Sequence, residues 1–178
     1  MAELTPELSR PVRLDTLGEV PRAIRVEANE AEREALTRRF RIVAIHRLEA
    51  EAMLVRIGEA VDCEGRLVAE AVQACVASGE DVPEKIDEPF ALRFVPETGG
   101  ANSADEEIEL DEAELDEVTY QGGAVDVGEA VAQTLALALN PYPRAPDADE
   151  ALKAAGVAGE GEQGSMAAAL KGLLGKGK

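Results

Sequence analysis

The chain has 178 residues, of which 46% are hydrophobic but only 3% aromatic, so we expect one domain whose core is built from Ala, Val and Leu. Its 36 acidic and 18 basic residues give a formal net charge of -18, which opposes non-specific binding to nucleic acid and favours basic partners. No apolar stretch approaches the roughly 18 residues that span a bilayer, and two cysteines do not make a disulfide framework, so we expect a cytoplasmic protein with reduced thiols.

The charge is unevenly distributed along the chain. Residues 1–66 hold 13 acidic residues and 11 arginines, which is close to balance. Residues 80–130 hold 17 acidic residues and only Lys85 and Arg93 as cations. The arginine-rich first third is therefore a candidate for RNA contact, although the whole chain is strongly acidic.

The N-terminal residues 1–27 contain three prolines between short apolar stretches, which is typical of an extended arm that could add a strand to a sheet. A helix is predicted from about Ala31 to Arg39. Asn29 is its expected N-cap, and Glu32 stands three residues later, where the second residue of a capping box belongs.

Four segments between this helix and residue 96 have the β-branched or alternating pattern of strands. Breaks are expected at the glycines and prolines between them, including Gly79 and the Asp81–Pro83 segment. The third segment is rich in Ala and could instead be helical, but its alternation favours a strand. The four predicted strands are residues 41–48, 52–57, 65–76 and 90–95.

A dense run of acidic residues occupies the region from 97 to 117, where few positions could be buried, so a long mobile acidic loop is expected. A short strand is predicted for Glu117–Tyr120. The following Gly122-Gly123 turn leads into a helix that Asp126 is expected to cap, with Glu129 as the capping-box partner.

One stripe of this second helix carries Val127, Val131, Leu135 and Leu139, and prolines 141 and 143 end it. The remaining residues 147–178 are rich in Ala and Gly and are expected to form a flexible tail with a short helix at about 165–174. We thus predict a single α+β domain over residues 1–146, in which an antiparallel, meander-like sheet of four to six strands is covered by the two helices.

Catalytic chemistry has little support in the sequence. His46 is the only histidine, it lies within a predicted strand, and no Gly-x-Ser-x-Gly elbow accompanies any serine, so a structural or surface role is favoured over a catalytic one. The acidic run lacks the ligand spacing of a calcium loop, and Cys63, Cys75 and His46 do not have zinc-ligand spacing. We predict no catalytic residue, no metal, no cofactor and no small-molecule substrate.

The order of several segments resembles the YceD family of bacterial large ribosomal RNA subunit accumulation proteins, long described as a domain of unknown function (DUF177). The segments are Val68–Cys75, Phe90–Glu97, Val125–Glu129 and Leu135–Pro143, with an acidic stretch before the third, and the alphaproteobacterial-type variant is the nearest likeness. The matching residues are Cys75, Phe90, Phe94, Asp126, Gly128, Glu129, Leu135, Leu137, Pro141 and Pro143.

This resemblance implies a non-catalytic cytosolic protein needed for normal accumulation of 23S rRNA. Many family members carry Cys-x-x-Cys at the end of the central strand. Here Cys75 matches the first cysteine but Ser78 occupies the second position, and no Cys or His follows Pro143. A metal site is therefore not expected in this chain, and Cys75 is expected to be a small buried hydrophobic residue.

Two functional hypotheses follow. In the first, the protein is a ribosome-biogenesis adaptor whose acidic loop binds a basic ribosomal protein or large-subunit assembly factor; the expected contacts are Glu106, Glu107, Glu109, Asp111, Glu112 and Glu114. In the second, rRNA is bound directly near the first helix, where the candidate residues are Arg33, Arg38, Arg39, Arg41 and Arg47. A salt-bridged surface is the alternative interpretation of those arginines, and an unrecognised hydrolase is the weakest hypothesis.

Overall fold

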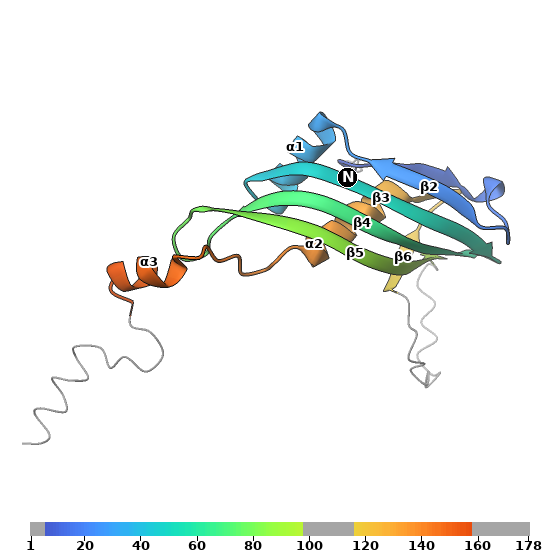
Figure 1. Ribbon diagram of the computed structural model, residues 1–178. Coiled ribbons are helices and arrows are strands. Elements are labelled where there is room, and N and C mark those ends of the chain that lie inside the picture. The colour runs from blue at the N-terminus through green and yellow to red at the C-terminus, as the bar shows by residue number, and fades with distance from the viewer. Residues whose placement is uncertain (1–5, 98–115, 158–178) are drawn as a thin grey trace, which may run out of the picture. The chain divides into compact units, whose positions relative to one another are not determined.

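A computed structural model describes residues 6–97 and 116–157, which include seven strands, three α-helices and one short 3-10 helix (Figure 1). In chain order they are β1 (Pro11–Arg13), η1 (Leu14–Thr16), β2 (Arg22–Glu27), α1 (Glu30–Phe40), β3 (Ala44–Ile57), β4 (Ala60–Ala74), β5 (Asp81–Pro96), β6 (Asp116–Tyr120), β7 (Ala124–Asp126), α2 (Val127–Ala138) and α3 (Ala148–Ala154).

The described residues belong to two compact units. The first takes its residues from Met1–Val72 and Pro83–Asn140, and the second takes its residues from Gln73–Val82 and Pro141–Lys178. The first unit holds the sheet with α1 and α2, and the second holds α3 and the end of β4. The α+β class is therefore confirmed, whereas the domain boundary expected at residue 146 stays a prediction.

The main sheet has five strands in the order β2-β3-β4-β5-β6, and β1 pairs with β7 in a separate two-stranded sheet. Strands β2 and β3 and strands β3 and β4 pair antiparallel, as a meander requires. Figure 1 shows α1 and α2 on one side of the large sheet, behind it in that view. The two helices of the first unit thus cover the same face of the sheet.

The core lies between the helices and the covered face of the sheet. In β3 the alternating residues Leu48, Ala50, Ala52 and Leu54 are buried, which is the period of two expected for a strand with one covered face. The helices contribute apolar side chains that are fully buried, namely Leu36 from α1 and Val127, Val131 and Leu135 from α2.

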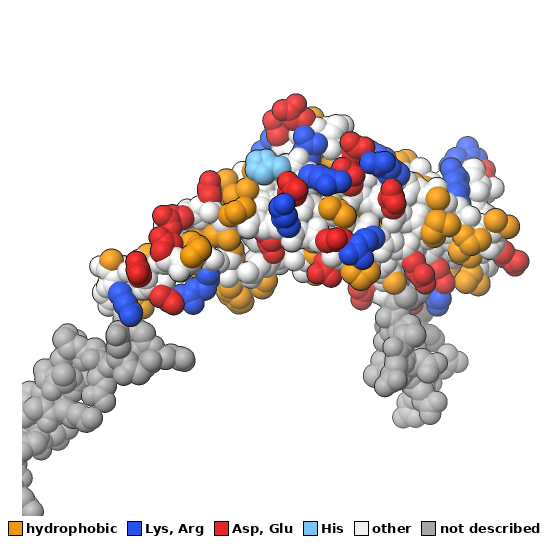
Figure 2. All heavy atoms as spheres, in the orientation of Figure 1, with side chains coloured by type: hydrophobic (Ala, Val, Ile, Leu, Met, Phe, Trp, Pro, Cys, Tyr) orange, Lys and Arg blue, Asp and Glu red, His pale blue; other side chains and the backbone are white. Residues whose placement is uncertain are grey.

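The outer face of the sheet carries charges of both signs, which Figure 2 shows interspersed over the strands together with patches of hydrophobic side chains. Neighbouring strands exchange ion pairs there, including Arg25 with Glu49 and Arg66 with Asp87. Such exposed pairs contribute little stability, about 0–1 kcal/mol each, but they neutralise arginines that would otherwise attract phosphate.

The structure confirms both predicted helices; α1 is one residue longer at each end than predicted, whereas α2 ends at Ala138, so Leu139 of the predicted stripe is its C-cap. Asn29 accepts a hydrogen bond from the Glu32 backbone N–H, and the Glu32 carboxylate accepts one from the Asn29 N–H, so the predicted capping box is present. The Ala-rich segment 65–76 lies mostly in β4, which confirms the prediction of a strand over that of a helix.

Several strand predictions need correction. The segments 41–48 and 52–57 are parts of one strand, β3, because Glu49 and Glu51 occupy positions on its outward face and do not interrupt it. The break expected at Asp81–Pro83 is also wrong, since β5 begins at Asp81. Residues 1–27, where an extended segment that could add a strand was expected, include two strands, β1 and β2.

Two further differences concern pairing and the tail. Strand β6 is parallel to β5, with Leu92 opposite Asp116, so the sheet is mixed and not wholly antiparallel. Residues 97–115 connect the two strands, and a connection of this length permits the crossover that parallel pairing needs.

Helix α3 lies in the segment that was expected to be a flexible tail. Glu150 in its first turn and Lys153 in its last turn interact favourably with the helix dipole and so stabilise the helix.

Candidate functional site

The Asp-Val-Gly-Glu motif (Asp126–Glu129) anchors the N-terminal arm, which we define as residues 7–10. Asp126 Oδ1 accepts hydrogen bonds from the backbone N–H groups of Gly128 at 3.0 Å and Glu129 at 3.2 Å, as predicted for an N-cap. The same carboxylate also accepts from Arg10 N at 2.7 Å and from Ser9 Oγ at 2.6 Å. One side chain therefore caps α2 and holds the arm against it.

Gly128 lies where the arm crosses the first turn of α2. A Cβ atom at this position would lie 2.7 Å from Arg10 N and 2.8 Å from Leu8 O, both of them backbone atoms. No flexible side chain is available to move aside, so the close approach of the arm requires glycine. The motif residues Asp126 and Gly128 consequently have structural roles.

Glu129 joins the two helices of the first unit. Its carboxylate accepts hydrogen bonds from both terminal nitrogens of Arg39, at 2.7 and 2.8 Å, and from Gln133. The hydrogen bond from Arg39 is the main reason that the pKa of Glu129 is lowered, while burial opposes this shift. The position predicted for a capping-box partner is thus used for an ion pair between α1 and α2.

The five arginines predicted to bind RNA do not form one free basic face. Arg39 pairs with Glu129 and with Glu7, and Arg47 pairs with Glu49. Arg33 donates to the backbone oxygen of Ala28 at 2.6 Å. Arg38 and Arg41 are exposed and have no ion pair among residues 6–97 and 116–157; Arg41 ends α1 in the left-handed conformation with φ of 56°.

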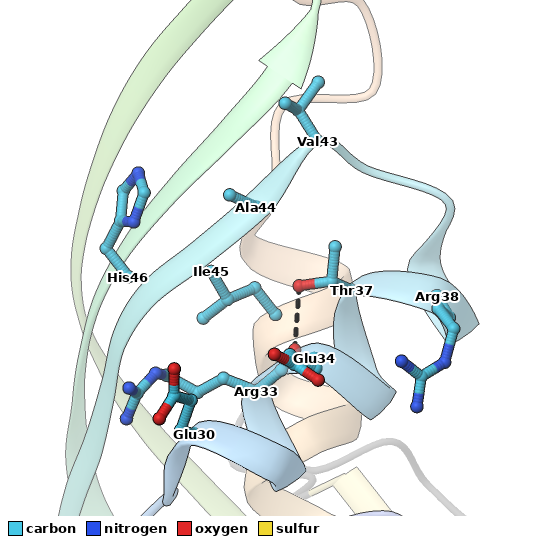
Figure 3. Close-up of a pocket in the computed structure, with 9 residues that line it drawn as sticks. All are labelled: Glu30, Arg33, Glu34, Thr37, Arg38, Val43, Ala44, Ile45 and His46. Atoms are coloured by element: carbon cyan, nitrogen blue, oxygen red, sulfur yellow. Dashed lines mark hydrogen bonds between the residues drawn. The ribbon is translucent and has the colours of Figure 1, made fainter.

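A hollow between α1 and the start of β3 is lined in part by Arg33 and Arg38, whose guanidinium groups lie on opposite sides of the view in Figure 3. Glu30 and Glu34 also line it, so its charge is mixed. Thr37 lies between the two arginines along α1, and its Oγ1 donates to the Arg33 backbone oxygen at 2.7 Å. The hollow is therefore a weak candidate for phosphate binding.

His46 borders the same hollow, but Figure 3 shows its ring on the other side of β3 from Ile45, which points toward α1. The register of β3 against β4 shifts between Ile45 and Arg47, which is typical of a β-bulge. The bulge leaves both His46 and Arg47 exposed. His46 has the position of a surface histidine, as the sequence favoured.

Cys75 belongs to the second unit and is buried there with Ala145 and Ala148. Its Sγ accepts hydrogen bonds from three backbone N–H groups, those of Ala145 at 3.3 Å and of Ala77 and Ser78 at 3.4 Å. These hydrogen bonds lower the pKa of Cys75 to about 6, and the bond from Ala145 has the largest effect, followed by those from Ser78. Burial is as expected, but the thiol is also a hydrogen-bond acceptor.

The other residues that carry the resemblance are mostly structural. Phe94 and Leu135 are fully buried in the core, and Phe90 packs against it from a partly buried position. Pro143 is buried and its backbone oxygen accepts from Val76 N, while Pro141 is exposed. Leu137 on α2 is also exposed, with 83% of it accessible to solvent.

The acidic contacts predicted for a partner lie outside the described residues, and so does the short helix predicted at about 165–174. The residues of the arm, Ser9 and Arg10, were not predicted as part of any site. Nothing in the local sequence indicates them, because their partner Asp126 is 117 residues away from Ser9. The predicted acidic contacts, for which the structure therefore gives no geometry, are Glu106, Glu107, Glu109, Asp111, Glu112 and Glu114.

Within residues 6–97 and 116–157, no group of three His, Cys, Asp or Glu side chains is arranged to hold a metal ion. The helices in this part of the chain are too short or too polar to cross a membrane. Cys63 is buried in the core, and burial raises its pKa to about 12, so this thiol stays protonated.

Comparison with known proteins identifies the family to which the chain belongs. Residues 63–173 match the family model described as large ribosomal RNA subunit accumulation protein YceD. Comparisons with curated proteins and with solved structures find no match. The matched region covers well over half of the chain and contains the Asp-Val-Gly-Glu motif, whose contacts are described above. The chain therefore belongs to the YceD family, which is named for the accumulation of large-subunit ribosomal RNA.

Proposed function

We propose that this protein supports the accumulation of large-subunit 23S rRNA without catalysis, as a cytoplasmic acidic adaptor for a basic ribosomal protein or assembly factor. Family membership supports the link to large-subunit rRNA, and the family is named for that accumulation and not for a reaction. The net charge of -18 supports a basic partner, because opposite charge accelerates and strengthens association.

The observation that carries this proposal is that few arginines of the described structure are free to bind phosphate. Most of its arginines are held by carboxylates of the same chain, whereas acidic residues outnumber basic ones two to one over the whole sequence. An arginine already paired with a carboxylate releases fewer counterions from nucleic acid. The paired arginines are Arg10, Arg13, Arg25, Arg39, Arg47, Arg66, Arg93 and Arg144.

The acidic run is the proposed contact region. Residues 105–117 contain nine acidic residues and no Lys or Arg. The last two of these acidic residues, Asp116 and Glu117, begin β6. A basic partner is suited to this run, because closely spaced carboxylates raise the local negative potential. The contacts proposed within it are those named above between Glu106 and Glu114.

The first test removes the charge of these six residues while keeping their size. We expect the variant with Glu→Gln at 106, 107, 109, 112 and 114 and Asp→Asn at 111 to bind a purified basic large-subunit ribosomal protein about tenfold more weakly at low salt. Exposed ion pairs contribute about 0.2–1 kcal/mol each, so the loss of six is worth about 1–6 kcal/mol, and the lower end of this range corresponds to about a tenfold change in affinity. Isothermal titration calorimetry at several salt concentrations measures the affinity and its salt dependence.

The matched control replaces charges on the outer face of the sheet. A variant with Glu51→Gln and Glu64→Gln, both on paired strands β3 and β4, should bind as the wild type does. The partner is selected by testing individually purified large-subunit proteins against the wild-type chain. Equal affinity and equal salt dependence for the wild type and the six-residue variant would contradict the adaptor proposal.

Direct rRNA binding is the second candidate. The observation in its favour is that Arg38 and Arg41 have no ion pair among the described residues and that Arg33 and Arg38 share the hollow of Figure 3. Against it, Arg39 is held by two carboxylates. A gel shift with large-subunit rRNA fragments at low salt tests this hypothesis. Binding that is lost in Arg33→Gln/Arg38→Gln would support direct contact, and the absence of a shift with the wild type would rule direct binding out.

A further inference from the structure

An open groove lies between α2 and one edge of the large sheet. It is lined by residues 88–92 of β5, residues 116–118 of β6 and residues of α2 from Ala130 to Ala138. The α2 residues that line it fall on one side of the helix, as their spacing of three and four residues requires: Ala130, Gln133, Thr134, Leu137 and Ala138. We call this feature the α2 groove.

The groove lies beside the point where the described pairing of β5 with β6 begins. The register pairs Leu92 of β5 with Asp116, the first residue of β6, and continues from there to Pro96 and Tyr120. Residues 88–91 of β5 therefore extend past the start of β6. Among the described residues, no strand pairs with 88–91 on that side, and residues 88–91 line the groove together with α2.

The groove contains an apolar anchor point. Leu137 is 83% exposed on its wall, and Phe90 and Val118 on the opposite side are only partly buried. A large exposed leucine beside partly buried apolar side chains is a common feature of binding surfaces, whose central residues become buried in the complex. The groove can thus bury apolar side chains of a partner.

The charged side chains around this apolar centre are all acidic. Glu88, Asp116 and Glu117 line the groove and are exposed, and its described lining contains no Lys or Arg. The nearest described cation on β5, Arg93, is held by Asp62 through two hydrogen bonds of 2.6 and 3.0 Å. An apolar floor with an acidic rim is complementary to a segment that carries both apolar and basic side chains.

We propose that the α2 groove binds an amphipathic basic segment of the protein partner. Leu137 packs against apolar side chains of that segment, and Glu88, Asp116 and Glu117 face its lysines or arginines. The proposal rests on the adaptor function, which it deepens by giving the partner a binding site on the folded part of the chain. A second copy of this chain is disfavoured as the occupant, because two chains of charge -18 repel each other.

The test uses the full chain and a synthetic amphipathic peptide of about 18 residues, in which Leu and Lys alternate with helical spacing. We expect this peptide to bind and to shift the backbone NMR signals of the groove residues. Leu137→Ser should weaken its binding at least about tenfold, because a buried leucine is replaced by a small polar residue. The matched control is Val20→Ser, since Val20 is 81% exposed but does not line the groove.

Two control peptides and one further variant give the opposing outcomes. Equal binding by a Leu/Glu peptide or by a Ser/Lys peptide would overturn the proposal, as would an unchanged affinity in Leu137→Ser. The chain's own residues Leu173 and Leu174 are an alternative occupant. If Leu173→Ser/Leu174→Ser in the full chain shifts the groove signals and strengthens peptide binding, the groove belongs to the C-terminal segment and the proposal is wrong.

The same variants separate the groove from the adaptor function. If the purified ribosomal protein loses affinity for the six-residue acidic variant but binds Leu137→Ser as it binds the wild type, the groove proposal fails and the adaptor proposal stands. If neither variant changes the affinity, both proposals fail. Loss of affinity in Leu137→Ser with Val20→Ser unchanged supports the groove.

Discussion

Replacing Gly128 with alanine should lower the free energy of unfolding by about 3 kcal/mol. The added Cβ would lie within 2.9 Å of three backbone atoms of the N-terminal arm, which belong to Leu8, Ser9 and Arg10. Overpacking of this kind costs about 1–3 kcal/mol and more where backbone must move. Urea denaturation followed by circular dichroism measures the loss.

The matched control for this variant is Gly123→Ala. A Cβ atom added to Gly123 would have no heavy atom within 4 Å, its φ is not positive, and it lies five residues before Gly128 in the chain. Its substitution should change the free energy of unfolding by less than about 0.5 kcal/mol. Similar stability for the Gly128 and Gly123 variants would show that the arm does not pack on α2 as described.

Asp126→Ala is expected to cost about 2–4 kcal/mol of unfolding free energy. The substitution removes the cap of α2, which is worth about 0.5–2 kcal/mol, and leaves the Ser9 hydroxyl and the Arg10 N–H without their acceptor. An unsatisfied buried donor adds about 1–3 kcal/mol. Because the site is partly buried, water replaces these bonds only in part.

Two comparisons make the Asp126 result specific. Asn29→Ala removes the cap of α1, which holds no second segment of the chain and is exposed, and it should cost about 1 kcal/mol. Asp126→Asn keeps one acceptor oxygen and should cost less than Asp126→Ala. A loss for Asp126→Ala no greater than that for Asn29→Ala would mean that the carboxylate caps the helix but does not anchor the arm.

Local chemistry predicted the helices and most of the strands. The caps Asn29 and Asp126 use side chains within three residues of the groups that they satisfy, so their spacing in the sequence is sufficient. The buried stripe of α2 follows from its period, and the same period correctly leaves Leu137 outside. The strand β4 was recognisable from alternation despite its alanines.

Features that depend on distant partners were not predictable. The parallel pairing of β6 with β5 depends on which strand edge is free, and no local pattern encodes that choice. The two predicted strands merged into β3 because outward-facing Glu49 and Glu51 resemble a break when the sheet is unknown. The Cys75 hydrogen bond from Ala145 joins residues 70 apart.

The candidate sites show the same division. The residues that carry the family resemblance could be recognised in the sequence, but their roles could not, since Asp126 and Gly128 act on an arm that precedes them by more than 100 residues. The predicted basic face was overestimated because Glu7 and Glu129, which neutralise Arg39, are far from it in the chain. The α2 groove brings together residues of β5, β6 and α2 that are far apart in the chain, so no local pattern indicates it.

The ratio of large-subunit to small-subunit rRNA in host cells depleted of this protein tests the central claim most directly. The cells are supplied with the wild type, with the six-residue acidic variant or with Arg33→Gln/Arg38→Gln, each at equal protein level. We predict that depletion lowers the ratio selectively, and that the wild type and the arginine variant restore it whereas the acidic variant does not. Restoration by the acidic variant, or a ratio that depletion leaves unchanged, would contradict the account.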